Sequence, residues 1–166
     1  AVSFSGTGTS YTWTNNQTAV GLAASGTGNI VAFNALNPSS SLISTATVSV
    51  TPQFTNNNVT CPGPVQTFTI TVNPIPVVTP LANATFCNGT NTSLITINGT
   101  GTSYAWTNST TSIGLGASGS GNIPPFAATN IGSTPVNATI GIIPSFTNAG
   151  VTCAGLNSNA TITINP

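Results

Sequence analysis

The chain contains one decapeptide twice: residues 6–15 read GTGTSYTWTN and residues 99–108 read GTGTSYAWTN. Trp13 and Trp106 are the only two tryptophans, and each lies in one copy of the decapeptide. Their separation, 106 − 13, is 93 residues, which is close to the length of one small β-domain. Aromatic residues alternate with Ser and Thr in both copies, and this alternation is typical of a β-strand with one buried face.

The similarity extends well beyond the decapeptide. VGLAASGTGNI at 20–30 returns as IGLGASGSGNI at 113–123, and VSVTPQFTNNNVTC at 48–61 returns as IGIIPSFTNAGVTC at 140–153. One residue is lost between these two blocks, so the offset falls from 93 to 92. The chain therefore consists of two copies of one module.

A proline-rich segment, NPIPVVTP at 73–80, separates the two copies. Three prolines in eight residues favour an extended and fairly stiff connection. We therefore expect two domains, 1–74 and 75–166, arranged end to end. Nothing in the first copy matches residues 77–87, so that copy is predicted to lack its first strand.

Apolar residues alternate with Thr, Ser and Asn at matching positions of both copies, as in TFTITV at 67–72 and ATITI at 160–164. A period of two is typical of antiparallel sheets with one buried and one hydrated face. With short strands between Gly, Pro and Asn, it predicts an all-β chain with one β-sandwich in each copy. The predicted core residues are Val2, Phe4, Tyr11, Trp13, Ala46, Val48, Val50, Phe68, Ile70 and Val72, and their counterparts Ile95, Ile97, Tyr104, Trp106, Ala138, Ile140, Ile142, Ala160, Ile162 and Ile164.

Lys, Arg, Asp, Glu and His are all absent, whereas about a quarter of the residues of an average chain are charged. Acid–base catalysis and the activation of a Ser or Thr nucleophile need such side chains, so no enzyme activity is expected. Zinc and calcium lack their usual ligands, and we expect neither a metal nor a cofactor. Nucleic-acid binding relies on Lys and Arg, and no apolar run reaches the roughly 18 residues of a membrane span, so neither nucleic acid nor membrane insertion is expected.

The three cysteines become interpretable once the repeat register is applied. Cys61 and Cys153 are equivalent, and the equivalent of Cys87 would lie before residue 1. We therefore predict a Cys87–Cys153 disulfide in the second copy and a partner for Cys61 outside the chain. Such a bridge would stabilise the fold by about 4 kcal/mol and would imply an oxidising compartment. The alternative is that all three thiols are reduced.

Two glycine-rich stretches, SGTGN at 25–29 and SGSGN at 118–122, invite comparison with phosphate-binding loops. Neither is followed by Lys or by a helix, so turns that need positive φ are the better interpretation.

The aromatic pairs Tyr11 with Trp13 and Tyr104 with Trp106 share strand register, which predicts core side chains rather than carbohydrate-stacking platforms. Rows of Thr are predicted to form a hydrated sheet face. The alternative for the Thr rows is an ice-binding or polysaccharide-binding surface.

Taken together, the motifs YxWTN, [VI]GLxASG[TS]GNI, FTNxxVTCxG and T[IV]T[VI]NP resemble PKD-like modules of very large Bacteroidota cell-surface adhesins. TFCNG at 85–89 is similar to the opening of the same module. The resemblance covers 76–166 and the later four-fifths of the module in 1–75. It implies tandem immunoglobulin-like (PKD-like) β-sandwich domains, an extracellular position at the cell surface, and a role in long adhesins, some of which act in gliding motility. It brings no catalytic residue.

We therefore expect a structural stalk repeat of a giant extracellular adhesin filament, whose partners are neighbouring repeats of the same polypeptide. One alternative is a module that binds surface polysaccharide or a solid substratum through exposed aromatics and Thr rows. Another is a fibre subunit that swaps strands between chains. The exposure of Trp13 and Trp106 distinguishes the stalk repeat from the binding module, because a stacking platform needs an accessible ring.

Overall fold

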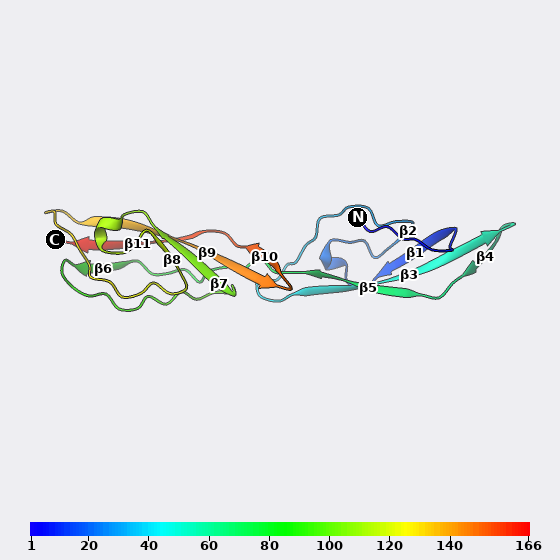
Figure 1. Ribbon diagram of the computed structural model, residues 1–166, viewed down its shortest axis with the longest axis horizontal. Helices are drawn as coiled ribbons and strands as arrows, with labels where there is room; N and C mark the ends of the chain where they lie inside the picture. Colours follow the sequence, from blue (N-terminus) through cyan, green and yellow to red (C-terminus); the bar gives the residue numbers. More distant parts are fainter. The chain divides into compact units, whose positions relative to one another are not determined.

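The computed structural model describes all 166 residues, which form two compact units, Ala1–Pro74 (unit 1) and Ile75–Pro166 (unit 2). The boundary coincides with the one expected from the repeat. All regular elements are β-strands, apart from two 3-10 helices of three residues each (Figure 1). No helix has the length and apolar character needed to cross a bilayer.

Unit 1 contains one five-stranded sheet, in which β3 is central. Strand β1 pairs with one edge of β3. The opposite edge of β3 pairs first with β5 and then, further along β3, with β4. All three pairings are antiparallel. Strand β2 pairs with the outer edge of β1. The elements are β1 (Ser10–Asn15), η1 (Thr18–Val20), β2 (Ser25–Thr27), β3 (Ser44–Asn56), β4 (Val59–Pro62) and β5 (Gln66–Val72).

Unit 2 repeats this arrangement and adds one strand. Its sheet has the order β6-β11-β9-β7-β8, with β10 on the same edge of β9 as β11. The additional strand, β6, lies parallel to β11, and unit 1 has no counterpart of it, as the repeat register predicts. The elements are β6 (Ala84–Cys87), β7 (Ser103–Asn108), η2 (Thr111–Ile113), β8 (Ser118–Ser120), β9 (Val136–Asn148), β10 (Val151–Ala154) and β11 (Ser158–Asn165).

A second layer of extended segments covers the inner face of each sheet. These segments pair only at isolated bridges: Val2 with Ile30 in unit 1, and Val78 with Gly99, Asn91 with Ala127 and Ile95 with Ile123 in unit 2. Ile30 and Ile123 are almost fully buried against the tryptophan-containing cores. Each unit is therefore a β-sandwich in which one layer is a continuous sheet and the other is loosely paired.

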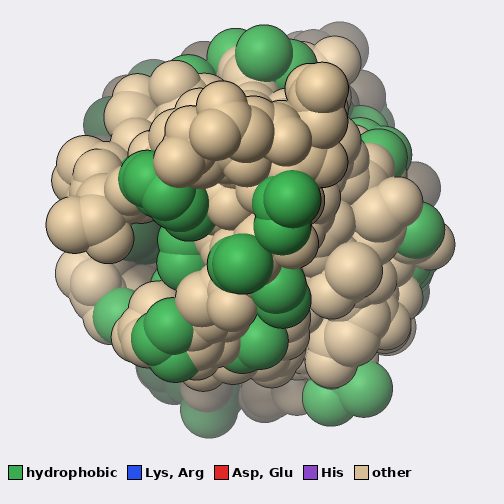
Figure 2. All heavy atoms as spheres, turned by 90° about the vertical axis from the view of Figure 1, so that its right-hand side faces the viewer, with side chains coloured by type: hydrophobic (Ala, Val, Ile, Leu, Met, Phe, Trp, Pro, Cys, Tyr) green, Lys and Arg blue, Asp and Glu red, His purple; other side chains and the backbone are tan.

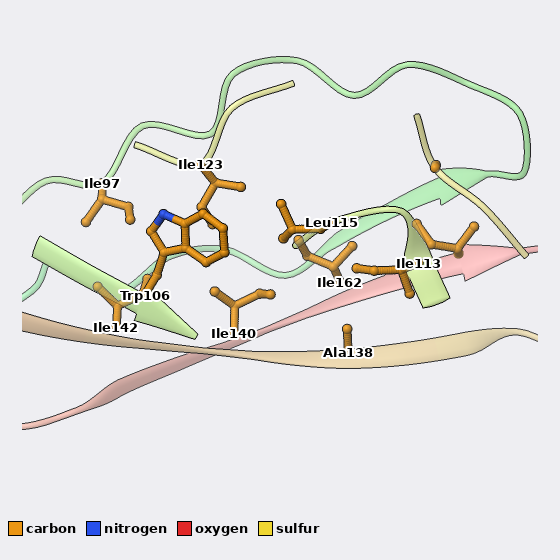
Figure 3. Packing of buried hydrophobic residues seen from close by; sticks show 11 residues of the cluster. Ile97, Trp106, Ile113, Leu115, Ile123, Ala138, Ile140, Ile142 and Ile162 are labelled. Atoms are coloured by element: carbon orange, nitrogen blue, oxygen red, sulfur yellow. The ribbon is translucent and has the colours of Figure 1, made fainter. Parts of the chain in front are cut away.

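The residues that alternate along the strands fill the space between the layers, as predicted. In unit 2, Trp106 lies among Ile97, Ile123 and Ile140 (Figure 3). Every other predicted core residue of unit 2 is buried or packs against this cluster, and the predicted core of unit 1 behaves in the same way.

Proline is accommodated in the long central strands by a gap in their pairing. Strand β5 pairs with β3 up to Val50, and β4 pairs with it from Gln53 onward. Pro52 lies in the gap between them, where its missing N–H removes no hydrogen bond from that edge. Pro144 occupies the same gap between β11 and β10 in unit 2.

Buried asparagine side chains hold the loops to the sheets. The amide nitrogen of Asn108 lies within 2.9–3.3 Å of the carbonyl oxygens of Thr110, Leu115 and Gly116, and its oxygen accepts from the N–H of Thr110. Asn15 makes the equivalent set of contacts in unit 1. These neutral side chains supply hydrogen-bond donors to carbonyls of the loop that follows each tryptophan strand.

The two glycine-rich stretches are explained by two different requirements. Gly28 and Gly121 have φ of 68° and 70°, as expected for positive-φ turns. Gly26 and Gly119 are glycine for another reason: a Cβ atom at either position would overlap the ring of Trp13 or Trp106. The sequence pattern alone did not reveal this contact.

We expect Gly119→Ala to destabilise unit 2 by about 2–3 kcal/mol, because the added methyl must displace a buried indole. Gly116→Ala is the matched control, since its Cβ would meet nothing within 4 Å and should change stability by less than about 0.5 kcal/mol. Denaturant unfolding followed by tryptophan fluorescence measures both, and equal effects of the two substitutions would contradict the packing described.

Asn108→Asp is expected to introduce a pH dependence that the wild-type chain lacks. A carboxylate there would face three carbonyl oxygens, so we expect a loss of more than about 3 kcal/mol at pH 8. The loss should be smaller at pH 4, because the protonated acid can still donate one hydrogen bond. Stability of this variant therefore falls as pH rises.

Denaturant unfolding at both pH values provides the test, with exposed Asn137→Asp as the control. The unmodified chain has no Asp, Glu or His, so its stability should be flat between pH 4 and pH 8. A wild-type chain that loses stability over this range would refute the expectation.

Candidate functional site

Trp13 and Trp106 are core residues with 7% and 4% of their surface exposed. Their Nε1–H groups are buried and have no hydrogen-bond partner in either unit. Neither ring offers an accessible face for stacking, which disfavours the aromatic-platform alternative.

Tyr11 and Tyr104 are partly buried and pack against the cores, as expected. In unit 1, Phe4 lies 5.7 Å from Tyr11 and 6.4 Å from Phe68 between ring centroids, so three aromatic rings form one group. The equivalents of the two phenylalanines in unit 2 are Ile97 and Ala160, and the aromatic group is therefore a feature of unit 1 alone.

A groove runs along one side of unit 1 beside this aromatic group. It consists of two adjoining hollows of about 350 and 460 Å³, which share Thr7, Pro52 and Pro64 in their walls. One hollow extends over Phe4, Tyr11 and Phe68, and the other extends toward the β3–β4 hairpin.

Figure 2 views unit 1 from its hairpin end and shows hydrophobic side chains gathered at this end, with no charged group among them. Phe54, Val59 and Val65 are more than half exposed in this part of the unit. The groove therefore offers apolar contacts and neutral polar groups to a ligand.

The Thr rows differ between the units. In unit 1 the outer sheet face carries cross-strand pairs such as Thr12 with Thr51 and Thr47 with Thr69. In unit 2 the corresponding face is interrupted by Gly141 and the exposed Ile143. A ligand-binding Thr array would therefore not be common to both repeats, which favours the hydrated-face interpretation.

The predicted Cys87–Cys153 disulfide is wrong: all three cysteines are free. Cys87 pairs with Asn165 beside the start of β9, whereas Cys153 pairs with Phe146 near its end. The ten residues of β9 between Val136 and Phe146 span about 33 Å, while a disulfide needs Cα atoms within about 7 Å. The error arose because the repeat register gives equivalence between copies but not proximity within one copy. Cys61 is exposed, and its predicted partner outside the chain stays a prediction.

The groups available at the surface are hydroxyls, amides, thiols, backbone edges and apolar side chains such as Phe54 and Val59. Such groups suit recognition of another polypeptide through backbone hydrogen bonds and apolar contact. Comparison with known protein families and with curated protein sequences finds no match to this chain.

Replacing either Cys87 or Cys153 by Ser should change the stability of unit 2 by less than about 1 kcal/mol, because neither thiol is bonded. Under non-reducing conditions, thiol titration of the denatured chain should count all three cysteines. Two missing thiols, together with a loss of about 4 kcal/mol in each variant, would restore the disulfide.

Proposed function

We propose that the chain is a pair of structural stalk repeats of an extracellular adhesin filament. The observation that carries the proposal is the pairing of the first and last strands of unit 2. Strand β6 lies parallel to β11, and Asn83 Oδ1 accepts a 2.8 Å hydrogen bond from the N–H of Thr161. A pull on the two ends of the unit therefore shears this ladder along its length. The hydrogen bonds are strained together rather than opened one after another.

The absence of charge supports the same role. Attractions and repulsions between surface charges depend on ionic strength, and this chain has no charged side chain that salt could screen. It also has no Lys or Arg for trypsin-like proteases to recognise. A stalk with this composition keeps its properties in surroundings of changing salt and pH.

The resemblance to PKD-like modules supports the finer parts of the proposal. These are an immunoglobulin-like topology in each unit, an end-to-end tandem arrangement, a position at the cell surface, and service in attachment or gliding. In this role the partners are neighbouring repeats of the same polypeptide, and the chain is not an enzyme.

Single-molecule stretching of the whole chain tests the proposal. Unit 2 should resist a higher force than unit 1, because only unit 2 has the parallel first and last strands. The two events are distinguishable, since unit 2 releases more chain on unfolding. Asn83→Ala removes one hydrogen bond from the sheared edge and should lower the unfolding force of unit 2, with unit 1 as the internal control.

Two outcomes would overturn the stalk proposal. One is a unit 2 that yields at the same force as unit 1 or below it. The other is saturable binding of the chain to insoluble polysaccharide or bare glass that is lost when the Thr rows are replaced by Ala. The second result would make the repeats adhesive in their own right.

A further inference from the structure

The tripeptide Asn-Gly-Thr occurs twice in unit 2, at 88–90 and at 98–100. An asparagine followed by glycine is prone to spontaneous loss of its side-chain amide, because glycine has no side chain to shield the backbone nitrogen that attacks. The asparagine and the glycine of both copies are exposed, so water reaches both sites. Judged by sequence and exposure alone, the two copies should react alike.

In the first copy, hydrogen bonds hold both reacting groups. The N–H of Gly89 donates to the carbonyl of Ala128 at 2.8 Å, and Asn88 Oδ1 accepts from the N–H of Asn130 at 2.9 Å. The N–H of Asn88 also donates to the carbonyl of Asn165 at 3.0 Å. The attacking nitrogen and the amide under attack are therefore tied to other segments, and a reaction here requires local opening of the fold.

In the second copy, the same two groups are free. The N–H of Gly99 makes no hydrogen bond, and neither does the side-chain amide of Asn98. Their neighbours hold segment 77–79 instead: the N–H of Thr100 donates to the carbonyl of Val77 at 2.9 Å, and the N–H of Thr79 donates to the carbonyl of Asn98 at 2.8 Å. This is the antiparallel pattern in which Gly99 exchanges no hydrogen bond with the residue opposite, so its N–H faces away from the segment.

Glycine at position 99 is fixed by packing. A Cβ atom there would overlap the carbonyl of Val77 and would lie 3.1 Å from the hydroxyl of Tyr104. The close approach of segment 77–79 therefore requires the residue that makes a preceding asparagine reactive. Unit 1 has the equivalent glycine, Gly6, but Ser5 precedes it and has no amide to lose.

We propose that Asn98 is a site of spontaneous deamidation in the folded chain. The backbone nitrogen of Gly99 forms a bond to Cγ of Asn98, the Cγ–Nδ2 bond breaks, and the proton of the attacking nitrogen leaves with the amide as ammonia. The product is a succinimide ring. Water then adds to one of the ring carbonyls and opens the ring, which yields either aspartate at position 98 or an isoaspartate linkage.

The reaction alters both the charge and the backbone of unit 2. Either product places a carboxylate in a chain that has no acidic side chain. In the isoaspartate, the main chain runs through the former side chain and gains one carbon atom ahead of Gly99. The carbonyl that Thr79 contacts and the N–H of Thr100 then lose the spacing that matches segment 77–79. Deamidation therefore loosens the hold on this segment as the chain ages, and the inference does not depend on the stalk role.

Peptide mapping of the folded chain after incubation at mildly alkaline pH tests the inference. Chymotryptic cleavage after Phe86, Leu94 and Tyr104 places the two tripeptides on separate peptides, and mass spectrometry measures the amide lost from each. We expect Asn98 to convert at least about tenfold faster than Asn88, because only Asn88 must wait for local opening. In denaturant the two sites should convert at similar rates, since the difference lies in the fold.

The structural consequence is measured with Asn98→Ser, which gives unit 2 the residue that unit 1 has at this position. With Trp13→Phe in each chain, the fluorescence of Trp106 reports unit 2 alone. Incubation should lower the melting temperature of unit 2 by at least about 4 °C when Asn98 is present and should leave the Asn98→Ser chain unchanged. Asn88→Ser is the matched control and should not prevent the fall.

Three results would overturn the proposal. The first is a folded chain that keeps the amide of Asn98 under conditions in which the denatured chain loses it. The second is an Asn88 that reacts as fast as Asn98 in the folded chain. The third is a fall in melting temperature that Asn98→Ser does not prevent. The stretching test of the stalk proposal, made on freshly prepared chain, is independent of all three.

Discussion

The fold depends on satisfying buried polar groups without a single charged side chain. Asparagine does this in both units, because one amide both donates and accepts hydrogen bonds. Asn108 and Asn15 hold the loop after the tryptophan strand, while Asn130 and Asn37 tie a later loop to the last strand through the carbonyls of Ile164 and Val72. An ionised group at these positions would carry a large desolvation cost, whereas the amide keeps the core neutral.

Much of the architecture was predictable, because a period of two fixes which side chains face inward. Trp13, Ala46 and Ile140 lie where the alternation puts them. The repeat also predicted the unit boundary and the missing first strand of unit 1. The roles of the asparagines and of Gly119 were not predictable, since they depend on contacts between segments distant in sequence. The disulfide failed for a related reason: register relates equivalent residues of two copies, but distance within one copy depends on strand order.

The two units act as natural comparisons for one another. They share the sheet, the tryptophan, the glycine beneath it and the proline in the pairing gap, which identifies these features as the minimal requirements of the module. They differ in the edge strand, in Phe68 against Ala160, and in the outer face at Gly141 and Ile143. The differences therefore include an inward-facing position as well as the outer face, since Phe68 packs against the core of unit 1 and Ala160 is buried in unit 2.

The positions of the cysteines have a practical consequence. Because the chain has no lysine, amine-reactive labels can react only with its N-terminus. Because it has no carboxylate side chain, carbodiimide coupling has no side chain to modify. Cys87 and Cys153 remain as addressable groups at opposite ends of one sheet. With Cys61 replaced by Ser, a donor dye and an acceptor dye could be attached to Cys87 and Cys153. Energy transfer between the two dyes would report the distance across unit 2. The length of the module could then be followed while it is stretched.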